Sequence, residues 1–233
     1  MIVTRRENIE RFGTTPEAML RDFNLAPGES FGLSDPAIVA KYWNRPVEVD
    51  LLVDDGDVLD VGGLKLEVVH LPGHCPGHVG LWNPHTGTLY PGDVMHYPTP
   101  LGPYPIGDAK AHWRSIERCL SFKPQLLLEG HGLSAYSEAS SRRRLLHMQM
   151  QQRGTHERVH QILRRERRPL TISEVMPEVM PVKTELDYAV STGIGERRCY
   201  AEACVQTHLL WLIEEGRVQR IEEDGQIRFA AVE

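Results

Sequence analysis

The sequence predicts an α+β protein in two parts, a sheet-forming part followed by a smaller and mainly helical part. Between residues 47 and 131, short apolar segments alternate with polar residues and are separated by glycine and proline, as is typical of strands. From about residue 142 onward, apolar residues recur at helical spacing, and two strands close the chain. We therefore expect one domain over residues 1–141 and a second over residues 142–233.

The composition indicates an ordinary globular protein. Of the 233 residues, 41% are hydrophobic and 25% are charged, and the formal net charge of −6 argues against a general nucleic-acid or membrane binder. The four cysteines, Cys75, Cys119, Cys199 and Cys204, have no CxxC spacing and are expected to be reduced thiols. No apolar run is long enough to span a bilayer, so we expect a cytoplasmic location without membrane contact.

In the first part, the chain from Met1 to Thr4 is expected to form a short strand, and residues 15–43 are expected to hold two short helices. These helices form an insertion that is either a lid or a plain surface excursion. A strand is predicted around residues 64–68, because Leu64, Leu66 and Val68 alternate with Lys65 and Glu67.

Further strands and one helix complete the first part. A hairpin is predicted around the turn sequence PHTG at residues 84–87. An amphipathic helix is predicted over residues 109–122, followed by a buried strand in the apolar run after Pro124.

The second part is expected to contain three helices and a β-hairpin. The first helix covers residues 140–168 with a possible break at Gly154, the second begins at Ser173 and stops at Pro181, and the third covers residues 196–215. On the third helix, one apolar face is expected, made of Tyr200, Ala203, Cys204, Thr207, Leu210 and Trp211. A hairpin follows around Asp224 and Gly225. This order of elements is that of a small winged-helix domain.

Three motifs in the first part carry candidate chemistry. PGHCPGH follows one predicted strand and ends at His78, YPGD ends at Asp93, and EGHG contains His131 at the end of a third strand. Histidine and carboxylate are good ligands for zinc and similar divalent metals. Because side chains at strand ends meet at one edge of a rigid sheet, these residues are expected to converge.

The order and spacing of these motifs resemble the later metal-binding motifs of the metallo-β-lactamase superfamily. The resemblance covers residues 1–141 and implies part of an αββα sandwich. It also implies a hydrolase that uses a metal-bound hydroxide, up to two zinc ions, and a small-molecule substrate. It does not identify that substrate, because one fold supports many reactions.

The resemblance assigns a role to each motif residue. It implies that His78 binds the first metal, that Asp93 bridges both metals as the central catalytic residue, and that His131 binds the second metal. His74 would shape the loop that presents His78 without binding the ion itself. His96 and Tyr97, shortly after Asp93, are candidates for lining the substrate cleft.

The sequence departs from the family at one motif. HxHxDH, which supplies most of the family's metal ligands, does not occur in this chain and would precede Met1. Two interpretations remain open, a fragment of an ordinary metallohydrolase or a genuine short protein whose missing sheet is replaced by a partner or by self-association. The alternative to hydrolysis as a function is a catalytically dead binding or scaffold protein built from the same partial fold. In either case, the remaining sheet is expected to expose an apolar face, which self-association or a partner completing the missing sheet would cover.

The second part offers an alternative function in nucleic-acid binding, which its charges argue against. The helix over residues 140–168 is rich in arginine, and Arg197 and Arg198 begin the third helix. However, the predicted wing carries three acidic residues, Glu222, Glu223 and Asp224, which would repel phosphates. The remaining histidines are expected to be surface or hydrogen-bonded structural residues, namely His70, His85, His112, His147, His156, His160 and His208.

Overall fold

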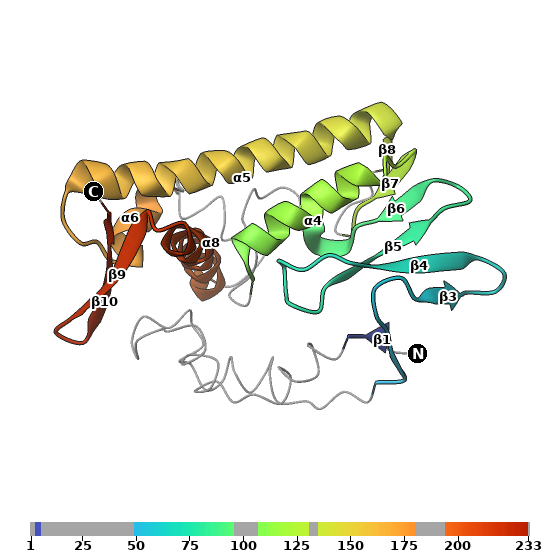
Figure 1. The fold of residues 1–233 in the computed structure, drawn as a ribbon, viewed down its shortest axis with the longest axis horizontal. Helices are drawn as coiled ribbons and strands as arrows, with labels where there is room; N and C mark the ends of the chain where they lie inside the picture. The colour runs from blue at the N-terminus through green and yellow to red at the C-terminus, as the bar shows by residue number, and fades with distance from the viewer. Residues whose placement is uncertain (1–2, 6–48, 96–106, 131–134, 180–193, 233) are drawn as a thin grey trace. The chain divides into compact units, whose positions relative to one another are not determined.

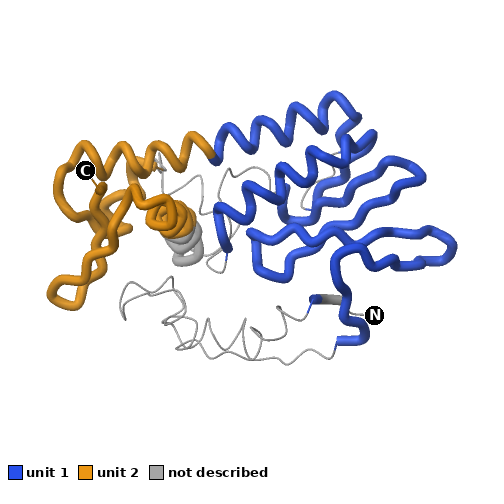
Figure 2. The backbone as a smooth tube through the Cα atoms, in the orientation of Figure 1, with its two compact units in different colours: residues 1–13, 47–152 blue, residues 14–46, 153–233 orange. Residues whose placement is uncertain are grey.

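The computed structural model describes residues 3–5, 49–95, 107–130, 135–179 and 194–232. These residues form two compact units that divide after Gln152, within one long helix (Figure 2). Each unit contains its own cluster of buried apolar side chains. The helices expected within residues 15–43 lie outside the described residues.

The first unit contains a six-stranded sheet (Figure 1). Its strands follow one another in space as they do in the chain, and they are β3 (Val58–Asp60), β4 (Lys65–His70), β5 (Val79–Asn83), β6 (Thr88–Tyr90), β7 (Leu126–Leu128) and β8 (Ala135–Ser137). Every neighbouring pair is antiparallel except β6 and β7, which are parallel. A parallel pair needs a crossover connection, and α4 (Ala109–Ser121) lies within that connection.

Helix α4 and the start of α5 (Glu138–Glu166) close the core of this unit. Ile116 and Cys119 of α4 and Leu145 of α5 are buried together with side chains of the sheet, including Leu89 and Leu127. The predicted helix over residues 109–122 is therefore confirmed. Asp108 caps its first turn by accepting a hydrogen bond from the Ala111 backbone at 2.9 Å.

The alternating segment around residue 66 forms β4 as predicted, but Leu64 lies outside the strand and is 42% exposed. Leu66 and Val68 are buried, and Lys65 is exposed. The hairpin around residues 84–87 is also confirmed as β5 and β6. A separate two-stranded parallel sheet pairs β1 (Val3–Thr4) with β2 (Leu51–Leu52), which confirms a strand at the start of the chain.

The second unit contains the end of α5, two further helices and a hairpin. The helices are α6 (Ile172–Val179) and α8 (Ile194–Glu214), and the hairpin pairs β9 (Val218–Glu223) with β10 (Gln226–Ala231). The hairpin turns at Asp224 and Gly225, both of which have positive φ, as predicted. Side chains from all of these elements form one buried cluster, in which Leu163, Val175, Leu209, Val218 and Phe229 are representative.

Two details of the helical predictions are wrong. Helix α5 continues through Gly154 without a break, because one exposed glycine costs only about 1 kcal/mol in a long helix. On α8, Leu210 is 38% exposed and does not share the buried face of Trp211. Instead, every residue from Cys204 to Leu209 is buried, so this part of α8 is covered on all sides.

A buried histidine in the second unit connects α5 to α8. The ring of His156 is fully buried against Trp211, with ring centroids 4.1 Å apart, and its Nε2 lies 3.1 Å from a carboxylate oxygen of Glu215. Arg217 binds the same carboxylate at 3.1 Å and Glu157 at 2.7 Å. Burial lowers the pKa of His156, and the hydrogen bond with Glu215 only partly opposes this shift.

We expect acidification to destabilise the second unit through His156. Because the pKa of His156 is lower in the folded chain, the unfolded chain takes up the proton first, near its ordinary pKa of about 6.5. The free energy of unfolding should therefore fall as the pH drops below about 6.5, by at most about 1.4 kcal/mol per pH unit for one proton. Denaturant unfolding between pH 7 and pH 5 measures this slope.

The matched control for this measurement is His147→Gln, which changes an exposed histidine of the same helix. His156→Gln should reduce the slope, whereas His147→Gln should leave it unchanged. An identical slope in wild type and His156→Gln would contradict the assignment. Glu215, Glu157, Arg217, His160 and His208 surround the site, and the lowered pKa of Glu215 adds a further loss of stability only at more acidic pH.

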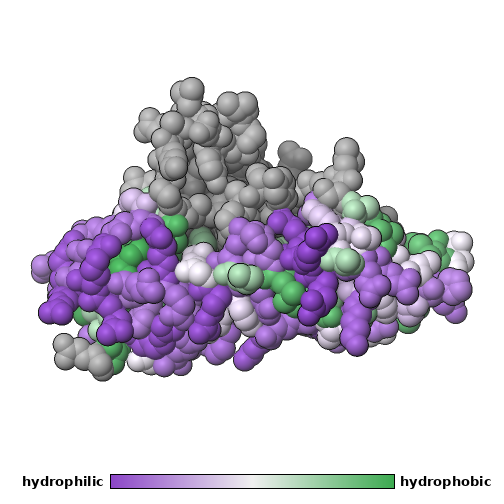
Figure 3. Space-filling model, turned by 90° about the horizontal axis from the view of Figure 1, so that it is seen from above, coloured by the Kyte–Doolittle hydropathy of each residue, from purple (hydrophilic) through white to green (hydrophobic). Residues whose placement is uncertain are grey.

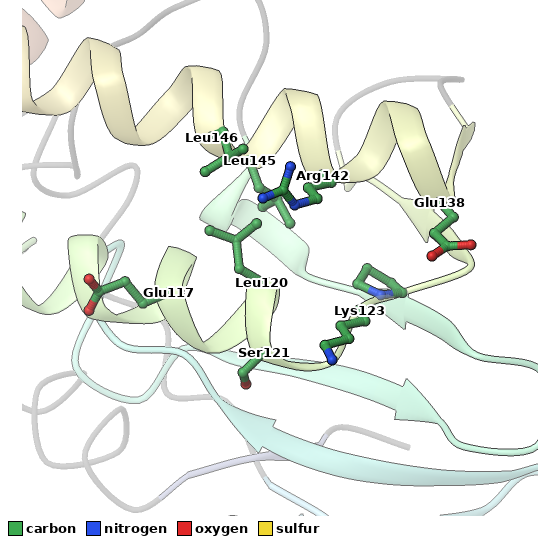
Figure 4. A pocket seen from close by; sticks show the side chains of 9 residues that line it. Glu117, Leu120, Ser121, Lys123, Glu138, Arg142, Leu145 and Leu146 are labelled. Atoms are coloured by element: carbon green, nitrogen blue, oxygen red, sulfur yellow. The ribbon is translucent and has the colours of Figure 1, made fainter.

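The first unit also contains a cavity of about 430 Å³ between the end of α4 and the start of α5 (Figure 4). Its wall combines leucine and proline side chains with two acidic and two basic residues. The lining residues are Glu117, Leu120, Ser121, Lys123, Pro124, Glu138, Arg142, Leu145 and Leu146. None of them belongs to the motifs expected to bind metal, so this cavity is distinct from the site described below.

The described surface is mixed in character. On the face seen in Figure 3, hydrophilic residues predominate among those coloured. Several exposed large apolar side chains nevertheless lie close together in sequence around β2 and β3, namely Leu51, Leu52, Val58, Val61 and Leu64. Within the described ranges, no helix is both long enough and apolar enough to cross a membrane.

Candidate active site

The loop between β4 and β5 carries the first motif. It begins at Leu71, whose backbone N–H donates to the carbonyl of His78 at 2.9 Å, so the two ends of the loop lie together. Inside the loop, the amides of Gly73 and His78 both donate to the carbonyl of Cys75, at 3.3 and 3.2 Å. These tight turns bring His74 and His78 to the same side, with ring centroids 5.7 Å apart.

Asp93 reaches the same edge of the sheet from the neighbouring strand. Strands β5 and β6 are antiparallel, so the start of β5 lies beside the end of β6. A single 3₁₀ turn, η1 (Gly92–Val94), follows β6 and turns Asp93 toward the loop. One carboxylate oxygen of Asp93, Oδ2, then lies 3.4 Å from Nε2 of His74, and both side chains are partly exposed.

His78 is held in one tautomer by two backbone groups. The backbone N–H of Asp93 donates to Nε2 of His78 at 2.9 Å, so Nε2 carries no proton. The proton of the neutral ring is therefore on Nδ1, which donates to the carbonyl of Leu71 at 2.9 Å. Histidines that bind metals in proteins usually donate their other ring N–H in this way.

The electrostatics keep His78 neutral. Burial lowers its pKa below the ordinary value, while the hydrogen bond to Leu71 and the negative charge of Asp93 oppose the shift. A neutral imidazole is the form that binds a divalent metal. The Nε2 lone pair of His78 accepts the hydrogen bond from the Asp93 backbone N–H, so an ion bound at Nε2 would replace that hydrogen bond.

Two glycines keep the space around these side chains open. Gly92 has a φ of +54°, and a Cβ atom there would lie 2.7 Å from Nε2 of His78. A Cβ atom at Gly130, after β7, would lie 3.3 Å from Oδ1 of Asp93. Side chains at these positions would crowd the two groups expected to bind metal, so the glycines of the GD and GH motifs have a direct steric role.

The structure brings together three of the six predicted site residues, His74, His78 and Asp93. The other three, His131, His96 and Tyr97, lie outside the described residues. The chemistry of His78 and Asp93 fits a divalent metal, with a neutral imidazole beside a carboxylate. Two ligands are fewer than the three or four protein ligands that zinc usually has. In the described part of the chain, no three His, Cys, Asp or Glu side chains form a group that could hold an ion.

Two residues of α4 near the site, Ser115 and Arg118, were not singled out from the sequence, and His70 was expected only as a surface or structural histidine. Ser115 of α4 donates to the carbonyl of Pro72 at 2.6 Å, and Nε2 of His70 lies 2.7 Å from the carbonyl of Pro76. Arg118 in turn binds the carbonyl of His70 at 3.1 Å. His70 directly precedes the loop, whereas only the tertiary fold brings Ser115 and Arg118 to this part of the chain, so no local spacing in the sequence could have indicated those two residues.

Comparison with known proteins identifies a family that matches this chain. The sequence profile of the metallo-beta-lactamase superfamily matches residues 14–131, just over half of the chain. Over 88 residues the chain is 32% identical to a probable metallo-hydrolase of Burkholderia pseudomallei, a match that covers 33% of this chain and 30% of that protein. The chain is also 32% identical over 93 residues to a hydroxyacylglutathione hydrolase of Methylobacterium nodulans, covering 40% of this chain and 36% of that protein.

An acyl-coenzyme A thioesterase of Homo sapiens is 29% identical over 118 residues, which cover 45% of this chain and 42% of that protein. The matches thus span between about a third and two fifths of these relatives.

Among solved structures, a metallo-beta-lactamase family protein of Thermus thermophilus has a TM-score of 0.75 at 21% identity, over 99% of this chain and 71% of that protein. A beta-lactamase domain protein of Burkholderia ambifaria has a TM-score of 0.65 at 20% identity, over 96% of this chain and 60% of that protein. At such identities these structures support the fold alone. The profile match, which covers just over half of the chain and includes the loop and the turn of the candidate site, shows that the chain belongs to the metallo-beta-lactamase superfamily.

Proposed function

We propose that this protein is a metal-dependent hydrolase, in which His78 and Asp93 hold a divalent ion. The observation that carries the proposal is the arrangement of His78. Its proton is fixed on Nδ1 by the carbonyl of Leu71, which leaves Nε2 unprotonated, and a bound ion would replace the Asp93 backbone N–H that Nε2 accepts. When bound, a divalent ion such as zinc supplies a water molecule of lowered pKa. Asp93 would be the central catalytic residue, and His131 would hold a second ion.

The contacts of Asp93 with the two motif histidines suggest how its carboxylate is oriented for binding an ion. Asp93 presents its carboxylate to His74 at 3.4 Å, and its backbone N–H to His78. His74 can therefore orient the carboxylate without binding the ion, as proposed from the family motif. His96 and Tyr97, which follow Asp93 in the sequence, are proposed to line the substrate cleft.

We propose small thioesters as the first substrates to test. Two relatives named above are a hydroxyacylglutathione hydrolase and an acyl-coenzyme A thioesterase. The matches cover only part of each relative, so a thioester remains a proposal for this chain. The alternative is a binding or scaffold protein without catalysis, which the small number of candidate ligands in the described residues favours.

The second domain, over residues 142–233, is proposed to be a winged helix with a structural role. The order of α5, α6, α8 and the β9–β10 hairpin supports this proposal. Glu222 and Glu223 are exposed on the hairpin, which argues against contact with nucleic-acid phosphates. The exposed apolar side chains around β2 and β3 support the further proposal that a second copy or another protein covers this region.

The function is tested by metal removal from the protein expressed from its native gene. Purified protein should contain zinc and hydrolyse an acyl-glutathione or acyl-coenzyme A thioester. Chelation should abolish turnover, and added zinc should restore it. Phosphodiester and lactam substrates belong in the same panel. Turnover that survives complete chelation would exclude metal-dependent hydrolysis. Zinc-loaded protein that hydrolyses none of these substrates would support the binding or scaffold alternative.

A further inference from the structure

The first turn of α4 lies directly against the loop that carries His74 and His78. The backbone N–H of Asp108, the cap of α4, donates to the carbonyl of Gly73 at 2.8 Å. A Cβ atom at Gly73 would lie 2.3 Å from Cα of His112 and 2.4 Å from its backbone nitrogen. The loop therefore contacts the helix backbone itself, with no side chain between them.

The side chain of His112 reaches the other half of the site. Its ring is buried, and Nε2 lies 3.1 Å from the carbonyl oxygen of Val94. A carbonyl only accepts hydrogen bonds, so Nε2 of His112 carries a proton and donates it. Val94 follows Asp93 directly in η1. His112 thus contacts the residue before His74 with its backbone and the residue after Asp93 with its ring.

Ser115 strengthens the same connection one turn later. It follows His112 by three residues, so both side chains lie on one face of α4. Its hydroxyl donates to the carbonyl of Pro72 at 2.6 Å, although the two residues are 43 positions apart. Since both helix residues are buried, this face of α4 forms a rigid support under the loop and the turn.

We propose that His112 is a positioning residue that sets the separation between the His74–His78 loop and Asp93. This inference rests on the proposed function, because the separation matters for holding a divalent ion. Loss of the hydrogen bond to Val94 would let the η1 turn move away from His78. Metal affinity should then fall, because two ligands on separate segments must be held at a fixed distance to bind one ion.

The test compares two buried hydrogen bonds of the same kind. His112→Leu removes a side-chain N–H that donates to a backbone carbonyl at the site. Gln152→Leu removes a side-chain N–H that donates to the carbonyl of Ala109 at 2.7 Å, at the start of the same helix, and neither Gln152 nor Ala109 belongs to the two ligand segments. His112→Gln keeps an N–H donor of similar reach and serves as the rescue variant.

Zinc affinity and thermal unfolding are measured on wild type and all three variants of the protein expressed from its native gene. His112→Leu should weaken zinc binding about 10- to 100-fold, as is typical when a residue that orients metal ligands is lost. His112→Gln should recover most of the affinity. Gln152→Leu should lower the unfolding temperature and leave zinc affinity unchanged. Equal losses of affinity in His112→Leu and Gln152→Leu would show that His112 only stabilises the fold, and would overturn the proposal.

A second readout needs no metal and separates the two hypotheses. The Asp93 backbone N–H donates to His78, so its hydrogen exchange reports how closely η1 and the loop stay together. In metal-free protein, His112→Leu should accelerate exchange at Asp93 more than at strand β4, whereas Gln152→Leu should affect both alike. Failure of wild type to bind zinc would refute the proposed function, while exchange at Asp93 would still decide the role of His112. If the ratio of the exchange rate at Asp93 to that in strand β4 is the same in His112→Leu as in wild type, the proposed positioning role of His112 is overturned.

Discussion

Replacing Asp93 with alanine should abolish metal-dependent hydrolysis in the protein expressed from its native gene. In the structure, Asp93 contacts both motif histidines, through its carboxylate to His74 and its backbone N–H to His78. In the proposed function its carboxylate would help to hold both ions, so its removal would weaken the binding of each. We expect zinc affinity to fall by about 100-fold or more and turnover to fall to background.

The fold should survive this change. The Asp93 side chain is 28% exposed and lies on a short turn, so Asp93→Ala should alter the free energy of unfolding by less than about 1 kcal/mol. Asp93→Asn, which keeps the shape but removes the charge, is the matched variant and should also lose zinc. Metal content, turnover and unfolding are measured together. Near-normal activity in Asp93→Ala would place the catalytic site elsewhere.

The histidines should rank in a defined order in the same assay. His78→Ala should depress activity strongly, because the unprotonated Nε2 of His78 is the atom proposed to bind an ion. His74→Ala should cost less, because His74 is proposed to orient Asp93 without binding the metal. A larger loss in His74→Ala than in His78→Ala would mean that His74 is itself a ligand.

The sequence predicted those elements whose signals are local. Alternation defined β4, turn residues defined the β5–β6 and β9–β10 hairpins, and an amphipathic pattern defined α4. Strand β8 (Ala135–Ser137) was not predicted, since three residues at a sheet edge are too few to show alternation. The break expected at Gly154 did not occur, because packing on both sides of a 29-residue helix outweighs the preference of one glycine.

The part of the candidate site that depends on neighbouring strands was also predictable from the sequence. Chain order placed His78 directly before one strand and Asp93 after the next, and antiparallel pairing brings the start of the first strand beside the end of the second. The contribution of α4 was not predictable, because His112 reaches Val94 across 18 residues and Ser115 reaches Pro72 across 43. Those contacts depend on how the crossover connection folds back onto the sheet. His112 accordingly resembled an ordinary structural histidine until its partners were known.

Gly73→Ala should be the most destabilising single methyl addition in the first unit's ligand loop. Gly73 has a φ of +132°, and the added Cβ would lie 2.3 to 2.5 Å from three atoms of His112, two of which belong to the helix backbone. No rotamer change relieves a contact with backbone, so either the loop or α4 must move. We expect the free energy of unfolding to fall by about 3–5 kcal/mol.

Gly63→Ala separates this clash from backbone strain. Gly63 also has a positive φ, of +90°, but nothing lies within 4 Å of the position that its Cβ would occupy. Both substitutions restrict the unfolded chain equally, so that contribution cancels. Gly63→Ala should therefore cost only the strain of a left-handed backbone, about 1–2 kcal/mol. Urea unfolding of the two variants measures the difference, which combines the clash of the added Cβ with α4 and the difference in backbone strain between φ values of +132° and +90°. Equal destabilisation at both positions would show that the loop adjusts freely and that α4 does not fix its place. A larger loss at Gly73, accompanied by weaker zinc binding, would show that the support beneath His74 and His78 contributes to both stability and ligand geometry.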